Sequence, residues 1–90
     1  MYEIGIDWDE DSIDHIWMHG VEPDEVDEVV ESDFLLLRAR SSRHYAMGQT
    51  SAGRYLAVVL ARKQSGRHRC VTARSMTDAE RRHYVRVKRR

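Results

Sequence analysis

The sequence contains little cysteine or proline and no long apolar run, so it has few residues for disulfides, for interrupting helices or for spanning a membrane. It holds one cysteine, Cys70, and one proline, Pro23, among 90 residues. A lone cysteine cannot form an internal disulfide, and its place in an apolar segment predicts a buried structural thiol, as in the reducing cytosol. The longest apolar run, Tyr55 to Ala61, is far shorter than the roughly 20 residues of a membrane span. Because the acidic N-terminus does not resemble a secretory signal, we expect a cytoplasmic protein that does not meet a membrane.

The first third of the chain lacks positive charge altogether. Residues 1–33 contain thirteen Asp and Glu and no Lys or Arg, whereas residues 34–90 contain all fifteen Lys and Arg and only two acids. The formal net charge of zero therefore hides two oppositely charged halves. These halves can act as mutual counterions, but exposed ion pairs contribute little and do not require segregation. We favour a basic half that faces an external anion, because a surface of one sign steers polyanions.

The hydrophobic periodicity predicts one α+β domain over residues 1–90, with residues 86–90 as a frayed basic tail. A short edge strand is expected over residues 2–8, followed by two helices that pack as a hairpin; the first is capped by Asp9 and ended by Gly20, and the second has Pro23 in its first turn. A period of two then predicts an antiparallel β-meander of about four strands, over residues 34–37, 43–49, 55–61 and 67–74. The third strand is apolar on both alternations and should be central and buried on both faces.

A final helix should follow the meander, because Thr77 and Glu80 have the spacing of a capping box. Strict alternation in the strand before it places His68, Cys70, Thr72 and Arg74 on one face. The elements together predict a two-layer domain whose sheet keeps one face open to a ligand.

Two motifs that could indicate other chemistry are incomplete. His15 and His19 have the spacing of a two-histidine metal site on a helix, but no third ligand is evident, so we expect no metal and no other cofactor. Gly48 and Gly53 are typical of turns or bulges rather than of a phosphate-binding loop. No G-x-S-x-G segment for a nucleophilic serine occurs.

The basic residues of the meander and the final helix give the strongest functional signal. Arginine binds phosphate through two parallel hydrogen bonds and tyrosine stacks on unpaired bases, so such a surface is suited to RNA. Cleavage of RNA by its own 2′-hydroxyl needs a proton acceptor, a proton donor and charge stabilisation at phosphorus, which His, Tyr and Arg can supply. The spacing alone does not say which residues supply them. The residues that could converge are Arg43, His44, Tyr45, Arg62, Lys63, Arg67, His68, Arg69, Arg74, Arg81, Arg82, His83 and Tyr84.

Several separated segments together resemble the BrnT family of ribonuclease toxins from bacterial type II toxin–antitoxin systems. The matching pieces, in the family's order, are IDWD from residue 6, HGV from residue 19, Arg43, Gly48, VVLAR ending at residue 62, CVTAR ending at residue 74, and TDAER from residue 77 with Tyr84. The resemblance implies a RelE-like toxin that cleaves RNA without a metal ion and is blocked by a cognate antitoxin. It further implies that the antitoxin is a ribbon-helix-helix protein and that operator DNA is bound only through it.

The resemblance and the chemistry of the side chains suggest roles for the basic residues. Phosphate and transition-state charge are assigned to Arg43, Arg62 and Arg74, and proton transfer to His44 or Tyr84. The RNA-binding set is completed by Tyr45, Arg67, Arg69 and Arg81. Glu80 either orients a neighbouring arginine or caps the final helix, and both readings stay open.

The sequence departs from the family at positions near this site. Met18 stands where a lysine is usual, His15 where an asparagine is usual, and Ser42 where an acid is usual. Two other functions therefore remain open. One is a non-catalytic module that binds nucleic acid or protein with the same basic surface, and the other is an interaction protein that self-associates through its charged halves.

Overall fold

The computed structural model describes residues 4–39 and 42–89, which form an α+β domain with three helices and five strands. The order is β1 (Ile6–Asp7), α1 (Glu10–Trp17), α2 (Pro23–Glu31), β2 (Leu35–Arg38), β3 (Arg43–Gln49), β4 (Tyr55–Arg62), β5 (His68–Ser75) and α3 (Asp78–Lys88). The four meander strands begin and end within one residue of the prediction. Residues 2 and 3 of the predicted first strand lie outside the described residues. No helix in the described ranges is both long and apolar enough to cross a membrane.

Side-chain caps fix where the first and last helices begin. At the start of α1, the Ser12 amide donates to Asp9 Oδ1 over 2.7 Å, and the Asp9 amide donates to Ser12 Oγ over 3.2 Å. At the start of α3, the Glu80 amide donates to Thr77 Oγ1 over 3.1 Å, and the Thr77 amide donates to Glu80 Oε1 over 2.8 Å. Both capping boxes satisfy amides that would otherwise lack a partner. α3 continues through Lys88, so residues 86–88 are helical rather than a frayed tail.

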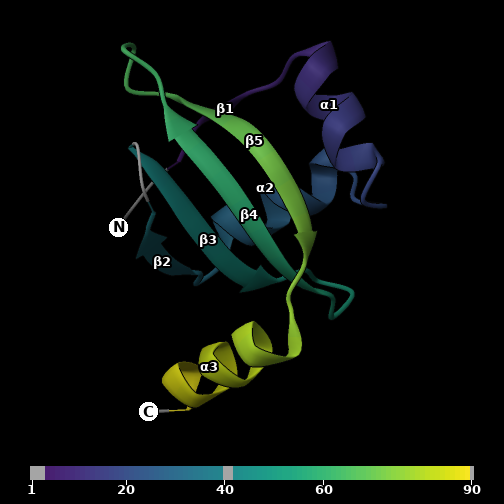
Figure 1. The fold of residues 1–90 in the computed structure, drawn as a ribbon, viewed down its shortest axis with the longest axis vertical. Coiled ribbons are helices and arrows are strands. Elements are labelled where there is room, and N and C mark those ends of the chain that lie inside the picture. The colour runs from purple at the N-terminus through teal and green to yellow at the C-terminus, as the bar shows by residue number, and fades with distance from the viewer. Residues whose placement is uncertain (1–3, 40–41, 90) are drawn as a thin grey trace.

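The five strands form one sheet in the order β1-β5-β4-β3-β2 (Figure 1). β2 to β5 make the predicted antiparallel meander. β1 is an edge strand, as predicted, but it pairs in parallel with β5, with Ile6 opposite His68. The sheet is therefore mixed rather than purely antiparallel. β4 lies in the centre and is buried from Leu56 to Leu60, which confirms the prediction for this strand.

Two of the helices cover the same face of the sheet. α1 packs mainly on β5 and α2 mainly on β3, so each contacts the sheet more than the other helix. The predicted helical hairpin is wrong in this respect, because the sheet offers each helix a larger apolar surface than a short neighbouring helix does. In Figure 1, α2 lies behind the sheet and α3 lies at one end of it.

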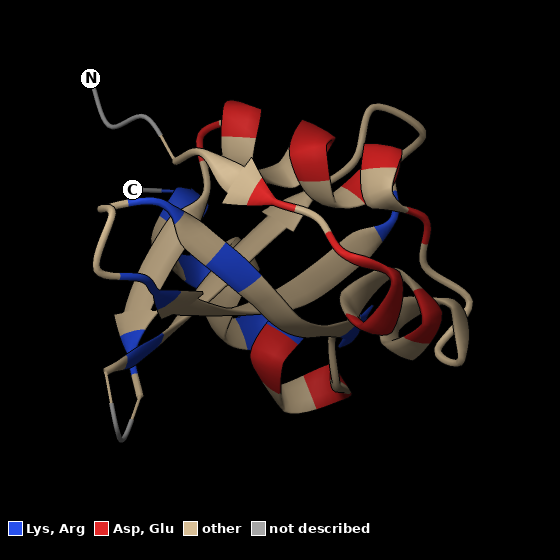
Figure 2. Ribbon diagram, turned by 90° about the horizontal axis from the view of Figure 1, so that it is seen from above, with Lys and Arg blue, Asp and Glu red and all other residues tan. Residues whose placement is uncertain are grey.

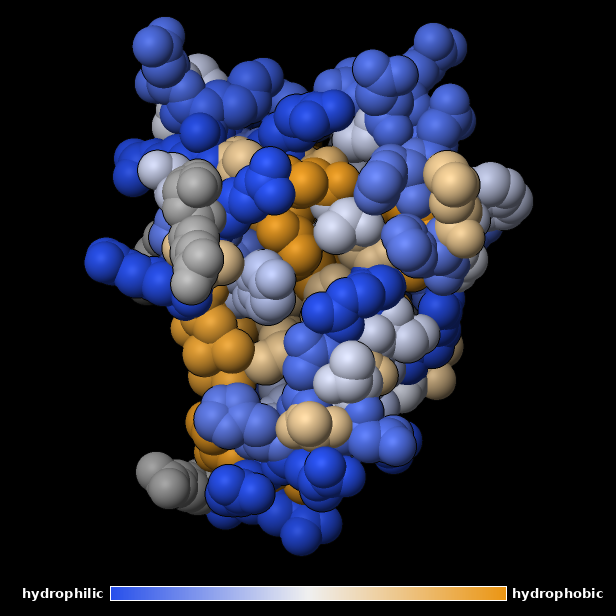
Figure 3. All heavy atoms as spheres, viewed as in Figure 1, coloured by the Kyte–Doolittle hydropathy of each residue, from blue (hydrophilic) through white to orange (hydrophobic). Residues whose placement is uncertain are grey.

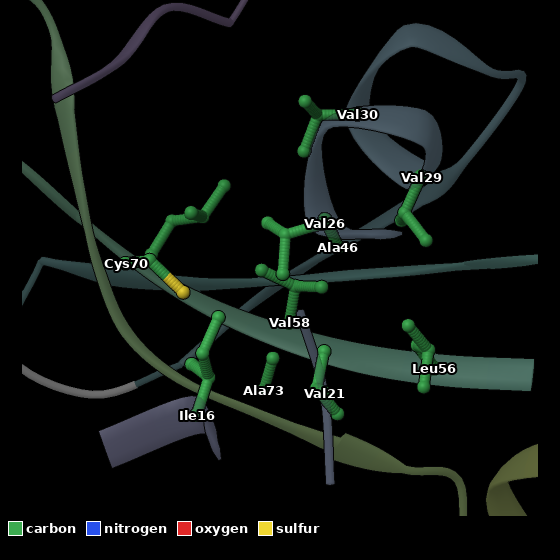
Figure 4. Packing of buried hydrophobic residues seen from close by; sticks show 11 residues of the cluster. Ile16, Val21, Val26, Val29, Val30, Ala46, Leu56, Val58, Cys70 and Ala73 are labelled. Atoms are coloured by element: carbon green, nitrogen blue, oxygen red, sulfur yellow. The ribbon is translucent and has the colours of Figure 1, made fainter. Parts of the chain in front are cut away.

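The main core fills the space between these two helices and the sheet (Figure 4). Its buried residues are Ile16, Val21, Val26, Val29, Val30, Ala46, Leu56, Val58, Leu60, Cys70 and Ala73. Burial raises the pKa of the Cys70 thiol to about 12, so the thiol stays protonated and unreactive. The prediction of a buried structural cysteine is thus confirmed.

β5 contains a register shift relative to β4, which makes Val71 an additional residue in the strand. Strict alternation had placed Cys70 on the same face as Thr72 and Arg74. The additional residue reverses the phase, so Cys70 and Ala73 both lie in the main core. Arg74 points to the opposite face, where its strand neighbour belongs to a second, smaller apolar cluster. The predicted grouping of side chains in this strand was therefore wrong.

Gly48 lies inside β3 and not in a turn or bulge. A Cβ at this position would lie 3.0 Å from Val29 Cγ1 and 3.4 Å from Phe34 Cβ. The glycine therefore permits the close approach of α2 to the sheet. Gly53 does lie in the predicted hairpin turn, with φ of 95°.

Candidate nucleic-acid interface

The sheet face opposite α1 and α2, here called the open face, is covered only at one end. There Tyr84 and Val85 of α3 pack with Met47 and Ala57 of the sheet. Figure 3 shows apolar surface between hydrophilic side chains on the side of the molecule that α1 and α2 do not cover. Register and alternation place these side chains on the open face: Arg43, Tyr45, Met47, Ala57, Val59, Ala61, Arg69, Thr72 and Arg74.

Arg74 is fixed on this face by Glu80. Its Nη1 donates to Glu80 Oε1 over 2.6 Å and its Nη2 donates to Oε2 over 3.0 Å. The hydrogen bonds from Arg74 are the largest cause that lowers the pKa of Glu80 to about 2, and the same pair raises the pKa of Arg74. Since Glu80 Oε1 also accepts the Thr77 amide, one carboxylate caps the helix and orients the arginine. The two readings of Glu80 that the sequence left open are both correct.

Tyr45 and Arg43 extend the same face along β3. Arg74 lies opposite Ala57, whereas Tyr45 and Arg43 lie one and two side-chain rows further along the sheet. Rows on one face are spaced by about 7 Å, since each residue rises about 3.3 Å. Tyr45 is close enough to Arg74 to contribute, after Glu80, to the raised pKa of the arginine. The face therefore carries a line of guanidinium, phenol and guanidinium groups.

The end of the face beneath α3 carries a stack of aromatic and cationic groups. The Arg81 guanidinium lies 4.2 Å from the ring centroid of Tyr55, and the Tyr55 ring meets Tyr84 edge to face at 5.9 Å. Tyr84 is only 9 % exposed, and it packs α3 against the sheet. Sequence reasoning missed Tyr55 because it opens an apolar run. The sequence signal that could have identified Tyr55 as a site residue was its position at the start of β4, the strand end nearest α3.

His44 and Arg62 are not brought to the open face. His44 pairs with Leu60 of the main core, and Arg62 pairs with His68 on the same side. Burial, followed by the charges of His44 and Arg62, lowers the pKa of His68, which agrees with this clustering. Successive strand residues point to opposite faces, so His44 and its neighbour Arg43 cannot share one site. The predicted catalytic set is thus divided between two faces.

Arg67 and Arg69, predicted to bind RNA, are each paired with an acid at the β1–β5 side of the sheet. Arg67 Nε donates to Asp7 Oδ1. The Lys63 ammonium lies 2.8 Å from the other carboxylate oxygen, Asp7 Oδ2. Arg69 Nε lies 3.4 Å from Asp9 Oδ2. Hydrogen bonds from Lys63 and then Arg67 are the leading causes that lower the pKa of Asp7.

The two charged halves of the chain are partly counterions of one another. Five of the six ion pairs found among residues 4–39 and 42–89 join the acidic half to the basic half. Figure 2 shows the acidic segments mainly on the helices and the stretch leading to them. The described Lys and Arg residues lie on the strands, on the turns between them and on α3 or at its end. Within the described ranges, the arginines without an ion pair include Arg43, Arg81, Arg82 and Arg86. The counterion interpretation is therefore confirmed for the paired side chains, while a basic half that faces an external anion stays a prediction.

The described residues bring no three His, Cys, Asp or Glu side chains together in a metal-binding arrangement. The His15 and His19 rings lie edge to face, with centroids 5.7 Å apart. The open face presents arginines and tyrosines, with Glu80 at its margin already engaged by Arg74. These groups can bind phosphate and stack on bases.

Comparison with protein families identifies the chain. The profile of the family described as "Ribonuclease toxin, BrnT, of type II toxin-antitoxin system" matches residues 8–80. The chain belongs to this family. The BrnT match runs from Trp8 to Glu80 and so includes the meander, Arg43 and the complete Arg74–Glu80 pair. As a BrnT ribonuclease toxin, the chain acts on RNA and has an antitoxin as its partner. No curated protein and no solved structure matches it at a significant level.

Proposed function

We propose that this BrnT toxin is a metal-independent, RelE-like endoribonuclease whose active site is the open face of the sheet. The observation that carries the proposal is the Arg74 guanidinium, which donates two hydrogen bonds to Glu80 and lies near Tyr45 on an uncovered sheet face. A cytoplasmic location, and a cognate antitoxin of the ribbon-helix-helix type that alone contacts operator DNA, belong to the same proposal.

The proposed reaction uses the RNA's own 2′-hydroxyl as the nucleophile. The 2′-oxygen bonds to the adjacent phosphorus, the bond from phosphorus to the 5′-oxygen breaks, and the products are a 2′,3′-cyclic phosphate and a 5′-hydroxyl. Arg74 and Arg43 stabilise the negative charge that grows on the phosphoryl oxygens. Tyr45 replaces His44 as the proton-transfer residue, because it shares the face with Arg74. Its phenol hydroxyl donates a proton to the leaving 5′-oxygen, while solvent accepts the 2′-proton.

The direct test is cleavage of RNA by the purified chain in the presence of EDTA, with analysis of the product ends. We expect cyclic phosphate and 5′-hydroxyl ends, and a rate about 10²–10³-fold lower for Arg74→Ala, the range for loss of one charge-stabilising group. Arg62→Ala is the matched control, since it removes the same side chain from the other face. Cleavage that stops in EDTA and returns with a divalent cation would refute metal independence. Equal rates for Arg74→Ala and wild type, with unfolding midpoints unchanged, would remove the open face from the mechanism.

The antitoxin part of the proposal is tested in a bacterial host. Induction of the chain alone should arrest growth, and co-expression of the short reading frame beside its gene should restore growth and give a stable complex. The Arg74→Ala chain should be harmless yet still form that complex. Continued arrest despite a complex with the neighbouring gene product would contradict neutralisation.

A further inference from the structure

A shallow groove of about 580 Å³ runs along the exposed side of α3. The groove is open to solvent, and its volume lets a nucleotide lie against the helix. The lining residues recur every three or four positions and so form one face of the helix: Asp78, Arg81, Arg82, Val85, Arg86 and Arg89. We infer that this groove binds an unpaired nucleobase of the RNA and selects guanine. The inference rests on the proposed function and goes beyond it by naming a base and the residues that select it.

Arg81 provides the stacking surface of the groove. One side of its guanidinium is occupied by the Tyr55 ring at 4.2 Å, while the residue also lines the groove. Tyr55 is in turn held by the buried Tyr84. The planar cation is therefore fixed before a ligand arrives, which reduces the entropy lost on binding. Unpaired bases stack on arginine planes of this kind in RNA-binding proteins.

Asp78 gives the groove its selectivity. It is the one acid among the lining residues, and within the described ranges its carboxylate takes part in no ion pair or side-chain hydrogen bond. A carboxylate only accepts hydrogen bonds, and its two oxygens match two adjacent N–H groups. Guanine presents such a pair, N1–H and the N2 amino group, on its Watson–Crick edge, whereas adenine, cytosine and uracil do not. Asp78 and Arg81 lie three positions apart, so one base can stack on the arginine and meet the carboxylate.

The rest of the groove suits the sugar and phosphate of the same nucleotide. Arg82, Arg86 and Arg89 line it as cations, and no ion pair engages them among the described residues. Val85 contributes an apolar wall and also packs against the cluster that anchors α3. The groove starts beside the proposed active site, since Glu80, which holds Arg74, directly precedes Arg81 in the helix. The selected guanine therefore belongs to a nucleotide next to the cleaved phosphate.

The test measures binding of short single-stranded RNAs that cannot be cleaved because every 2′-hydroxyl is methylated. Fluorescence anisotropy compares uridine hexamers that carry one central guanine, adenine or cytosine. We expect wild type to prefer the guanine hexamer about tenfold, the order of magnitude of one base-edge recognition. Asp78→Asn should reduce this preference to about twofold or less, because the amide can no longer accept both N–H groups. Asp24→Asn, which removes an exposed acid from the first turn of α2, is the matched control and should keep the preference.

A second pair of variants separates stacking from charge. Arg81→Lys keeps the charge but loses the plane, so affinity for the guanine and adenine hexamers should fall about tenfold. Arg62→Lys makes the same change on the other face of the sheet, outside the groove, and should leave affinity within about twofold. Wild type without a base preference, an Asp78→Asn variant with an unchanged preference, or equal losses in the two lysine variants would each overturn the inference.

Cleavage of the same hexamers with ordinary ribose separates this inference from the proposed function. If these are cut but the methylated set shows no preference for guanine, the groove inference fails and the ribonuclease assignment stands. If the preference exists and depends on Asp78 but no ribose RNA is cut, the ribonuclease assignment fails and the groove remains a guanine-binding site.

Discussion

Glu80 accepts hydrogen bonds from Arg74 at both carboxylate oxygens, over 2.6 and 3.0 Å. One of those oxygens also accepts a hydrogen bond from the Thr77 amide. α2 contains the same arrangement, a glutamate that caps the helix and binds an arginine. There Glu25 accepts the Glu22 amide at the start of the helix and lies 2.8 Å from Arg54 Nη1. The chain thus contains two glutamates with the same capping role and the same type of partner, only one of which lies beside the open face.

These two glutamates give a matched pair of variants. Glu80→Gln and Glu25→Gln should each lower the free energy of unfolding by about 1 kcal/mol, since each weakens one partly exposed ion pair. Only Glu80→Gln should also slow RNA cleavage, by about tenfold or more, because Arg74 is no longer held in place. Urea unfolding and single-turnover cleavage measure the two effects. If both variants cleaved RNA at the wild-type rate, Glu80 would have no positioning role.

The lowered pKa of Glu80 predicts a specific dependence of stability on acid. Its pKa is about 2 in the folded chain, against an ordinary value of 4.5, so between these values the unfolded chain binds the proton more readily. The stabilisation is therefore complete above pH 4.5 and is lost as the pH falls toward 2. The difference in unfolding free energy between wild type and Glu80→Gln should shrink over that interval. A difference that stays constant from pH 6 to pH 2.5 would show that the carboxylate is not held as described.

The division of the predicted site between two faces can be tested with neighbouring residues. Tyr45→Phe removes only the hydroxyl proposed to protonate the leaving oxygen and should slow cleavage by about 10²-fold or more. His44→Gln alters the adjacent position on the other face and should leave the rate within about twofold. Cleavage rates with saturating RNA measure both. The reverse order, with His44→Gln inactive and Tyr45→Phe active, would restore the original assignment.

Local signals predicted the elements well because each depends on a few neighbouring residues. The Thr77–Glu80 capping box and the buried run of β4 both lie where periodicity and capping chemistry put them. The parallel pairing of β1 with β5 was not predictable in the same way, because it joins Ile6 to His68 across most of the chain. No sequence signal predicted the additional residue at Val71. This residue decides which face of the sheet each earlier side chain of β5 points to.

The candidate site was predicted by residue type but not by position. Arg74 and Tyr45 were both predicted as site residues, and the open face brings them together. His44 was included because it stands beside them in the sequence, although adjacent strand residues point in opposite directions. Arg67 was included for its charge, yet its partner Asp7 comes from a distant segment. Which arginines are free and which are paired follows from tertiary contacts that composition does not encode.

The close approach at Gly48 predicts an energetic coupling between β3 and α2. Gly48→Ala places a Cβ 3.0 Å from Val29 Cγ1, so we expect a loss of about 1–3 kcal/mol in the free energy of unfolding from overpacking. Val29→Ala also destabilises, because it leaves a cavity in the fully buried core. In the double variant the new methyl group occupies the space that Val29 vacates, so the combined loss should be smaller than the sum by about 0.5–3 kcal/mol. Urea unfolding of the four chains measures this coupling. Strictly additive losses would mean that the backbone of β3 moves away from α2 and that the contact does not set the spacing between them.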